Sequence, residues 1–369
     1  MPDFARKNAC APLRLHRRSV LAGMAMSCCS PHGIGTAHGG SQEIGYSWQD
    51  WTRSFLMPEG RVVDPQQGGI SHSEGQAYGL LLAQAFGDES AFRLIEQWTS
   101  SHLAIRQDRL LAWKWMPDPQ DGTALDWRNA TDGDLIRAWA LLRATRDSGW
   151  GGYETTFRAI AQDIASICLA PDPRAPAERL LVPGAEARRQ SDRVLVNPSY
   201  FIPRALRELG EAADEPVLVR CADHSETVLA EMAATGFLAD WIDVTANGFE
   251  APQEHDFRWG YDALRIPLYL VWSGQVSHPA VMLAQKMMLT APIPDHVAVV
   301  IGPDGQVEAM SDEAGFRLIA DLASCTPSDA RKRSTGGGSA PYYPATLCLL
   351  AQIAMRESGC AAPDAQQKP

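Results

Sequence analysis

Apolar side chains at helical spacing recur along most of this 369-residue chain, and this pattern restricts the fold more than any other feature. Between residues 89 and 103, for example, Ala91, Leu94, Ile95 and Trp98 occupy the i, i+3, i+4 and i+7 positions that form one face of a helix. The predicted helices span residues 46–56, 74–86, 89–103, 133–145, 153–169, 199–209, 217–234, 261–272, 278–288, 312–323 and 344–356. They do not alternate with strands, which argues against a parallel α/β sheet. The sequence therefore predicts a mainly α protein.

Strand signals are few and lie between the predicted helices. Residues 297–301 and 306–310 flank a Gly-Pro-Asp-Gly turn and predict a hairpin. Residues 180–182 and 194–196 are a candidate strand pair. Residues 241–244 form another candidate strand, because they precede an Asn-Gly turn.

The first 40 residues differ from the rest of the chain, with five basic residues against one acidic residue. Arg17 and Arg18 precede a short apolar run at 20–26, and small residues follow. This order is typical of an export signal of the twin-arginine type. We therefore expect residues 1–40 to be a signal that is removed. Residues 41–369 contain no Pro- or Ser-rich linker and predict a single catalytic domain. The alternative for the first segment is a basic disordered tail.

Charge and hydropathy exclude two classes of partner. The chain has 33 Lys and Arg against 44 Asp and Glu, a net charge of −11. Binding to nucleic acid needs clustered basic residues, so the acidic balance argues against it. No apolar run reaches the roughly 18 residues of a membrane span. Together with the signal, these features predict a periplasmic or secreted protein.

Five cysteines follow the predicted signal: Cys168, Cys221, Cys325, Cys348 and Cys360. None belongs to a Cys-x-x-Cys pair, so the sequence supports neither a zinc site nor a redox motif. Buried free thiols are the default expectation. One disulfide is an open alternative in an oxidising compartment, and the sequence does not determine which cysteines would pair.

Three acidic residues share a setting, because each lies at a predicted helix start beside glycine or other small residues. They are Glu74, Asp132 and Asp262. Taken singly, each can be structural, since capping and the helix dipole favour carboxylates at helix starts. Ser73 and Gln76 fit a capping box that would place Glu74 in the first helical turn.

Glycines near two of these acids argue for more than capping. Gly75, Gly79 and Gly133 lie inside or at the start of predicted helices, where glycine costs about 0.5–1 kcal/mol relative to alanine. Such positions often mark close approach by another backbone or a ligand. His72, the histidine beside Glu74, is interpreted as a packing or cleft-wall residue.

The positions of the tryptophans are a second indication of a ligand-binding site. The chain has 11 Trp, and several lie in predicted loops, Trp127 among them. Trp113 and Trp115 are two residues apart, so their side chains would lie on one side of an extended segment. Aromatic rings in clefts stack on sugar rings, so these two are candidate substrate-binding residues. The alternative is that they are parts of the core.

Four segments in order along the chain strengthen the carbohydrate interpretation. They are Ser-Glu-Gly-Gln-Ala-Tyr-Gly at 73–79, Ala-Thr-Asp-Gly-Asp at 130–134, Asn-Pro-Ser-Tyr at 197–200 and Tyr-Asp-Ala-x-Arg at 261–265. Together they resemble glycoside hydrolase family 8, and the region 51–75 looks most like the periplasmic endoglucanases associated with bacterial cellulose synthesis. The resemblance implies an (α/α)6 barrel with a few short β-hairpins in the connecting loops. It also implies a sugar-binding cleft across one end of the barrel.

The resemblance assigns roles to individual residues. It implies that Glu74 is the general acid and Asp262 the general base. Asp132 would grip the sugar beside the scissile bond, Tyr200 would lie near the nucleophilic water, and Arg265 would orient Asp262. An inverting mechanism of this kind holds its two carboxyls roughly 6.5–9.5 Å apart to admit a water molecule. It requires no metal and no cofactor, and the sequence shows no metal-ligand pattern.

One physical tension concerns Glu74. The first turn of a helix stabilises a carboxylate as an anion, whereas a general acid must carry a proton. We therefore expect burial or the neighbouring Asp132 to raise the pKa of Glu74.

The leading hypothesis is an exported endo-β-1,4-glucanase that cleaves internal bonds of cellulose. Its partner would be a β-1,4-glucan, and the bacterial cellulose synthase machinery is a candidate second partner. One alternative keeps the fold and mechanism but acts on chitosan, xylan or mixed-linkage glucan. Another is a non-catalytic glucan-binding component of cellulose export, although the presence of both Glu74 and Asp262 argues against it.

Overall fold

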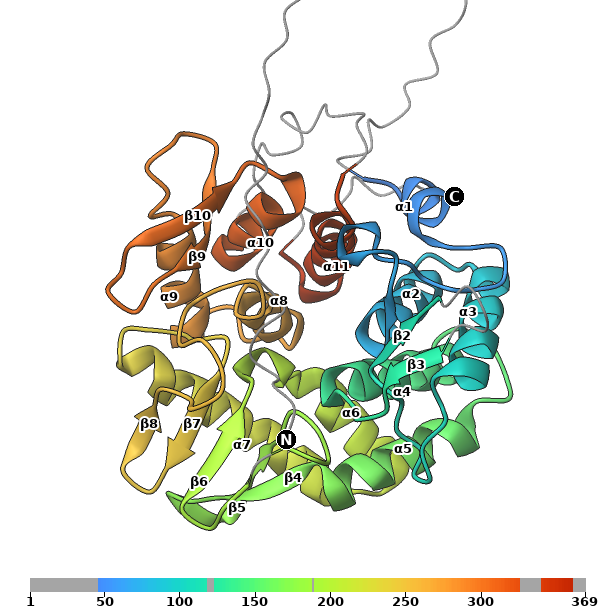
Figure 1. The fold of residues 1–369 in the computed structure, drawn as a ribbon, viewed down its shortest axis with the longest axis horizontal. Coiled ribbons are helices and arrows are strands. Elements are labelled where there is room, and N and C mark those ends of the chain that lie inside the picture. Colours follow the sequence, from blue (N-terminus) through green and yellow to red (C-terminus); the bar gives the residue numbers. More distant parts are fainter. Residues whose placement is uncertain (1–45, 118–122, 188, 326–339, 361–369) are drawn as a thin grey trace, which may run out of the picture. The chain divides into compact units, whose positions relative to one another are not determined.

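The computed structural model describes residues 46–117, 123–187, 189–325 and 340–360. Helices dominate this part of the chain, which confirms the predicted mainly α class (Figure 1). The α-helices are α1 (Trp48–Phe55), α2 (Ser73–Ala85), α3 (Glu89–His102), α4 (Thr131–Arg146), α5 (Glu154–Ile167), α6 (Pro203–Ala213), α7 (Pro216–Ala234), α8 (Arg265–Trp272), α9 (Pro279–Met288), α10 (Ala314–Ser324) and α11 (Tyr342–Ser358). The expected export signal at 1–40 lies outside the described residues.

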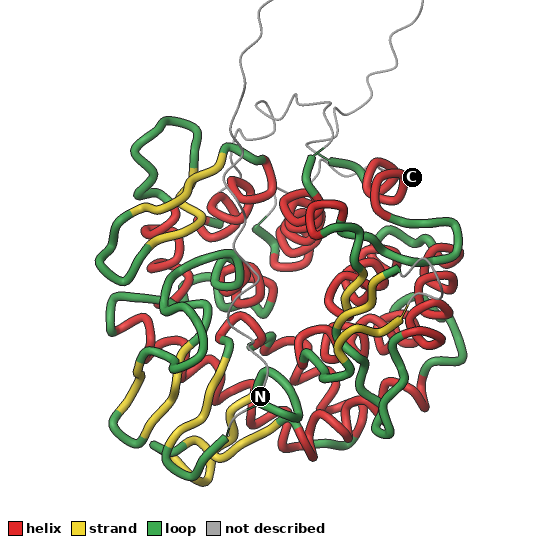
Figure 2. The backbone as a smooth tube through the Cα atoms, viewed as in Figure 1, coloured by secondary structure: helices red, strands yellow, loops and turns green. Residues whose placement is uncertain are grey.

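Inner helices contact one another in a closed ring, and other helices pack around it (Figure 2). Around the ring, α2 contacts α4, α4 contacts α6, α6 contacts α8, α8 contacts α11, and α11 returns to α2. Four of these helices, α2, α4, α8 and α11, are buried on nearly every side. Outer helices such as α3 and α5 bury only one apolar stripe. This is the architecture of the expected (α/α)6 barrel.

Glycine permits the close contact between α2 and α4. A Cβ added to Gly133 would lie 2.5 Å from Ser73 Oγ and 2.7 Å from Glu74 N. A Cβ on Gly75 would lie 3.0 Å from the hydroxyl of Tyr342 on α11. These distances confirm that the helical glycines mark close approach between elements.

Short strands lie in the connections between helices. One antiparallel sheet contains β1 (Ser71–His72), β2 (Lys114–Met116) and β3 (Thr123–Asp126), and another contains β6 (Arg193–Val196), β7 (Ile242–Thr245) and β8 (Gly248–Glu250). Two further pairs join β4 (Leu169–Asp172) to β5 (Ala175–Leu181) and β9 (Val297–Ile301) to β10 (Val307–Ser311).

Two of the three strand predictions are confirmed. The Gly-Pro-Asp-Gly turn joins β9 to β10, and the Asn-Gly turn joins β7 to β8. The expected pairing of residues 180–182 with 194–196 is wrong, since β5 pairs with its own neighbour β4 and β6 pairs with β7. The local sequence did not show that the partner of β6 is supplied by a distant segment.

Two helices begin four residues later than predicted. The segment expected to be helical from residue 199 starts as the 3-10 turn Pro198–Tyr200, and α6 begins only at Pro203. The segment expected to be helical from residue 261 forms a turn first, so Asp262 precedes α8.

The predicted capping box at the start of α2 is also wrong. The N-cap residue is His72, whose Nδ1 accepts a hydrogen bond from Gly75 N at 2.9 Å. The Gln76 side chain instead accepts a hydrogen bond from Val62 N and donates one to Thr99 Oγ1. His72 therefore has a structural role, as the interpretation of it as a packing residue implied.

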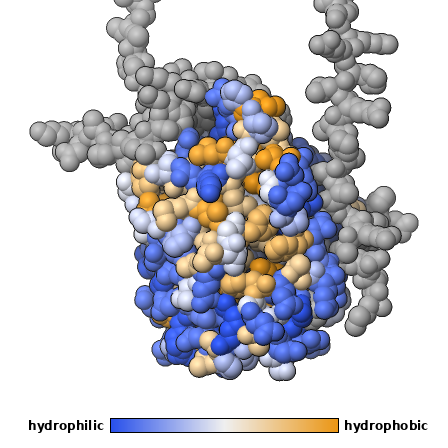
Figure 3. Space-filling model, turned by 90° about the vertical axis from the view of Figure 1, so that its left-hand side faces the viewer, coloured by the Kyte–Doolittle hydropathy of each residue, from blue (hydrophilic) through white to orange (hydrophobic). Residues whose placement is uncertain are grey.

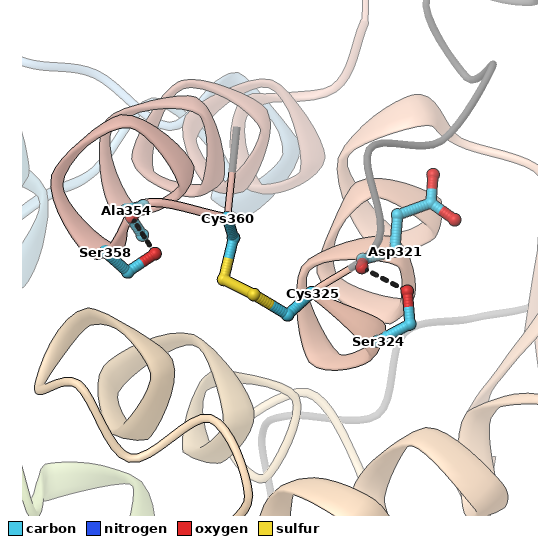
Figure 4. The surroundings of a disulfide bond; sticks show 6 residues. All are labelled: Asp321, Ser324, Cys325, Ala354, Ser358 and Cys360. Atoms are coloured by element: carbon cyan, nitrogen blue, oxygen red, sulfur yellow. Dashed lines mark hydrogen bonds between the residues drawn. A yellow bond between two sulfur atoms is a disulfide. The ribbon is translucent and has the colours of Figure 1, made fainter. Parts of the chain in front are cut away.

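Two of the five cysteines form a disulfide, Cys325 after α10 and Cys360 after α11 (Figure 4). The default expectation of free thiols is therefore wrong for this pair, and it is confirmed for Cys168, Cys221 and Cys348, which are buried. The bonded cysteines are 35 residues apart in sequence and meet because α10 packs against α11.

The surface in Figure 3 mixes hydrophilic side chains with small hydrophobic patches, as is ordinary for a water-facing protein surface. Within the described ranges, no helix has both the length and the apolar character that crossing a bilayer requires.

Candidate active site

Three acidic side chains from distant parts of the chain meet around one arginine, Arg265. Glu74 lies in the first turn of α2, Asp132 in the first turn of α4, and Asp262 in the turn before α8. Arg265 Nη1 donates to Glu74 Oε2 at 2.5 Å, and Arg265 Nη2 donates to Asp262 Oδ1 at 3.0 Å. The same Nη2 lies 3.7 Å from Asp132 Oδ2. The barrel thus brings together the three carboxyls and the arginine that the sequence singled out.

The four side chains differ in their access to solvent. Those of Arg265 and Asp132 are each 2% exposed, whereas those of Glu74 and Asp262 are 19% and 33% exposed. Asp132 Oδ2 is buried and receives no hydrogen bond from an N–H or O–H group of the described residues, whereas the carboxyls of Asp132 and Glu74 are close enough to share a hydrogen bond when one of them is protonated. Glu74 and Asp262 are therefore the carboxyls that a molecule arriving from solvent meets first.

Backbone contacts fix the acid-bearing helix starts. Ser73 N donates to Trp113 O at 2.9 Å, which ties the start of α2 to the segment leading into β2. Gly133 N donates to Asp132 Oδ1 at 2.8 Å within the first turn of α4. Because Gly133 lacks a side chain, this turn lies directly against the backbone of Glu74.

Side chains from the 197–200 segment hold Asp262 and Arg265. Asn197 Nδ2 donates to Asp262 Oδ2 at 3.0 Å. Ser199 Oγ accepts from Arg265 Nη2 at 2.8 Å and donates to Asn197 Oδ1 at 2.7 Å. The ring of Tyr200 faces the guanidinium, with 5.9 Å between Arg265 Cζ and the ring centroid.

A fourth carboxyl, Asp240, contacts the turn that carries Asp262. Asp240 Oδ1 accepts the backbone N–H of Gly260 at 2.9 Å and that of Ala263 at 2.8 Å. The residue is 7% exposed. Burial, together with the charge of Asp262, raises the pKa of Asp240 to about 7.

The pKa directions separate the carboxyls. Burial and the charge of Glu74 raise the pKa of Asp132 well above its usual range. Burial also raises the pKa of Asp262, and the charge of Arg265, which lowers that pKa, offsets only part of the increase. Burial acts to raise the pKa of Glu74 too, but the charge of Arg265 and the hydrogen bonds from Asp132 and Arg265 outweigh it and hold that pKa below the usual range.

The expectation that Asp132 raises the pKa of Glu74 is therefore wrong for this arrangement. Arg265 donates directly to Glu74 but lies 3.7 Å from Asp132, so it stabilises the Glu74 anion more. Of these two neighbouring carboxyls, Asp132 retains the proton.

The tryptophans expected to contact sugar have different surroundings. Trp115 on β2 is 9% exposed and packs edge-on against Trp98, with 5.3 Å between ring centroids. Arg61 covers its ring with Cζ 5.0 Å from the centroid. These contacts favour the core role that the sequence left open. Trp113 is half-buried, and its carbonyl binds Ser73 N beside Glu74.

Sequence reasoning missed Asn197, Ser199 and Asp240 as site residues. The first two lie in the Asn-Pro-Ser-Tyr segment that supplied Tyr200, so a signal for them was present. Asp240 had no local signal, because its partners Gly260 and Ala263 lie 20 and 23 residues further along the chain. Among the residues that the structure describes, no group of three or more His, Cys, Asp or Glu could hold a metal ion.

The model of the glycosyl hydrolases family 8 matches residues 22–357. The chain belongs to glycoside hydrolase family 8. It is therefore a glycoside hydrolase, and the family accounts for the barrel. An endoglucanase of Cellulomonas uda, which is similar to this family 8 chain, is 30% identical over 293 residues, or 78% of this chain and 80% of the relative.

Two further similar proteins cover more of the chain. A probable endoglucanase of Novacetimonas hansenii is 30% identical over 332 residues, covering 85% of this chain and 91% of the relative. The crystal structure of a family 8 endoglucanase from Klebsiella pneumoniae superposes with a TM-score of 0.76 at 29% identity, covering 84% of this chain and 98% of that one.

Proposed function

We propose that this family 8 glycoside hydrolase is an exported endo-β-1,4-glucanase that cleaves internal bonds of cellulose with inversion. The observation that carries the proposal is the placement of Glu74 and Asp262 on the two terminal nitrogens of Arg265. Such a pair can protonate a leaving oxygen from one side and activate water on the other. The names of the relatives, which are endoglucanases, support a β-1,4-glucan as the substrate.

Glu74 is the proposed general acid. Two neighbouring carboxyls cannot both ionise easily, so Glu74 and Asp132 share a proton over the pH range in which only one of them is ionised. Asp132 retains that proton in this structure, and Glu74 has the more exposed side chain. We propose that the proton passes from Asp132 to Glu74 and then to the leaving oxygen as the glycosidic bond breaks.

Asp132 is also the proposed sugar-gripping residue. Its Oδ2 is buried and receives no hydrogen bond from an N–H or O–H group of the described residues. Buried polar atoms are rarely left unpaired, so this oxygen is well suited to bind a hydroxyl of the sugar beside the scissile bond.

Asp262 is the proposed general base, taking a proton from the water that attacks the sugar. Asn197 and Arg265 donate to its two oxygens and fix the carboxyl plane. Its raised pKa makes it a stronger base than an ordinary aspartate. Tyr200 is proposed to lie near that water, and we expect the carboxyls of Glu74 and Asp262 to stand roughly 6.5–9.5 Å apart.

The substrate is tested by comparing hydrolysis of carboxymethylcellulose, chitosan, xylan and lichenan. We expect the highest rate on carboxymethylcellulose, and proton NMR of the first products should show the α-anomer. Faster cleavage of chitosan or xylan would favour the alternative substrates. A folded protein that cleaves none of the four would favour a non-catalytic glucan-binding role.

Export is proposed from the sequence of residues 1–40 and supported by the disulfide between Cys325 and Cys360, since such bonds persist in oxidising compartments. Fusing these 40 residues to a folded reporter should send it to the periplasm. Changing Arg17→Lys together with Arg18→Lys should stop this transport. Transport that survives would indicate the general secretory route. The proposed association with cellulose synthesis rests on the resemblance of residues 51–75.

A further inference from the structure

The carboxyl of Asp240 binds the turn that carries Asp262, and it has no role in the proposed mechanism. Asp240 Oδ1 accepts the N–H groups of Gly260 and Ala263, the second residue before Asp262 and the first after it. Asp240 N in turn donates to Arg258 O at 2.8 Å. The backbone on both sides of Asp262 is therefore anchored to a single side-chain oxygen.

The contact is too close for any side chain at residue 260. A Cβ on Gly260 would lie 2.3 Å from Asp240 Oδ2 and 3.2 Å from its Cγ. The backbone of Gly260 does not have the positive φ that itself favours glycine. Glycine is thus needed here to admit the Asp240 carboxyl.

We propose that Asp240 is a positioning residue for the catalytic base, holding the 260–263 turn so that Asp262 meets the attacking water. The proposal rests on the proposed role of Asp262. Two charged neighbours shift the pKa of Asp240: the charge of Asp262 raises it and the charge of Arg258 lowers it. Because its pKa is about 7, Asp240 is largely protonated at mildly acidic pH, so its Oδ1 must hold the turn without needing a full negative charge.

The test uses three single variants and one double variant. Asp240→Asn keeps an acceptor oxygen and removes only the charge, whereas Asp240→Ala removes both hydrogen bonds. At pH 5, the asparagine variant should keep kcat on cellohexaose within about threefold, and the alanine variant should lose at least about tenfold in kcat, with little change in KM. Gly260→Ala should be as damaging as Asp240→Ala, because its new methyl group meets the carboxyl.

The double variant Asp240→Ala/Gly260→Ala makes the contact itself testable. With the carboxyl removed, the methyl group has room, so the two losses should be strongly non-additive in both kcat and melting temperature. Additive losses would overturn the proposal, as would wild-type kcat in Asp240→Ala. An equal fall for the asparagine and alanine variants would also overturn it, since the acceptor oxygen would then not be what matters.

A pH series supplies a readout that does not depend on substrate. A carboxyl whose pKa is raised on folding binds its proton more tightly in the folded state, so the protein loses stability as pH rises from about 4 to 7. Asp240→Asn cannot titrate at this position, so its melting temperature minus that of the wild type should increase between pH 4 and 7 and stay constant above pH 7. A difference that does not change between pH 4 and 7 would contradict the assigned surroundings of Asp240. This result stands even if the wild type fails to cleave β-1,4-glucans, so the two failures can be told apart.

An independent observation concerns Trp127, which follows β3 and is 58% exposed. Arg106 holds it in place, with Cζ 5.4 Å from the ring centroid and Nη1 donating to Trp127 O at 2.9 Å. Arg106 is itself fixed by ion pairs with Asp108 at 2.7 Å and Glu186 at 2.9 Å. The Arg106 guanidinium therefore contacts the indole ring, while more than half of the residue remains exposed to solvent.

Polar groups surround this open ring. A pocket of about 390 Å³ is lined by Ile105, Arg106, Gln107, Asp108 and Trp127. Trp127 follows the third strand of the sheet β1-β2-β3, whose first strand leads into Glu74. Two strand spacings amount to roughly 10 Å, so a chain bound at the carboxyls could extend to this pocket. We infer that Trp127 and its polar neighbours form a distal subsite for one or two sugar units of the same glucan.

Binding of short and long cello-oligosaccharides tests this subsite. In the Asp262→Asn background, which prevents turnover, Trp127→Ala should weaken cellohexaose binding about 3- to 10-fold and leave cellotriose binding unchanged. Leu289→Ala, at an equally exposed apolar residue after α9, is the matched control and should change neither. Equal cellohexaose affinity in Trp127→Ala and its parent would overturn the subsite. Failure of the parent itself to bind cellohexaose would instead count against the proposed substrate.

Discussion

The acid side and the base side of the site are built differently. Glu74 and Asp132 lie in the first turns of α2 and α4, two inner helices in direct contact. Asp262 lies in a turn that depends on hydrogen bonds from Asn197 and to Asp240. Helix starts are fixed by backbone packing, whereas the turn is fixed by distant side chains. Apart from the two catalytic carboxyls themselves, we therefore expect changes around Glu74 to act mainly on stability, and changes around Asp262 to act mainly on catalysis.

The largest effect on stability is expected for Trp115→Ala on the acid side. Trp115 lies on β2, which pairs with β1 just before Glu74, and its ring packs in a cluster with Trp98. Removing it should lower the free energy of unfolding by about 3–5 kcal/mol, measured by denaturant titration. Unchanged stability with weakened glucan binding would instead support a sugar-contact role. Trp127→Ala, at an exposed tryptophan, is the control for stability.

A smaller loss of stability should follow Gly133→Ala. The new methyl group would lie 2.7 Å from Glu74 N and would push the starts of α2 and α4 apart. Overpacking of this kind costs about 1–3 kcal/mol, which thermal unfolding can measure. Gly79→Ala is the matched control, since its methyl group meets only side chains, those of Val62, Ile95 and Trp51, which can shift. Equal losses for both variants would show that the α2–α4 contact has no special importance.

On the base side, Asn197→Ala should change the pH dependence more than the stability. Its amide donates to Asp262 and lowers the pKa of that carboxyl. Removing the donor should therefore raise the Asp262 pKa and move the acidic limb of the kcat/KM profile to higher pH. The cost in folding free energy should be about 1 kcal/mol, because Ser199 Oγ loses its acceptor. If the acidic limb of the kcat/KM profile stayed at the same pH, ionisation of Asp262 would not be what determines it.

The same contrast explains what the sequence could predict. Glu74, Asp132 and Asp262 were all found from local signals, since acids beside glycines or small residues at predicted helix starts are visible in a short window. Asp240 and the disulfide between Cys325 and Cys360 were not, because their partners lie 20 or more residues away and meet only in the folded barrel. The core position of Trp115 was left open for a similar reason, since Trp98 reaches it from a different element.

Errors at helix starts have a related cause. The segment before α8 has a helical apolar pattern, yet Asp240 binds two of its N–H groups and holds it as a turn. At α2, the polar residues Ser73 and Gln76 matched a capping box, but His72 provides the cap and Gln76 binds elsewhere in the core. Long-range hydrogen bonds therefore overrode local preference in both places.

The central claim is that Glu74 acts as the acid and Asp262 as the base, and changing the leaving group tests it most directly. A dinitrophenyl group departs without a proton, whereas a sugar needs one, but water must be deprotonated in both reactions. Glu74→Gln should therefore lose about 10²–10⁴-fold in kcat/KM on cellohexaose and far less on a dinitrophenyl cello-oligosaccharide. Asp262→Asn should be impaired on both substrates, with circular dichroism showing both variants folded. Equal losses for Glu74→Gln on the two substrates, together with an Asp262→Asn variant that still cleaves cellohexaose, would contradict the assignment.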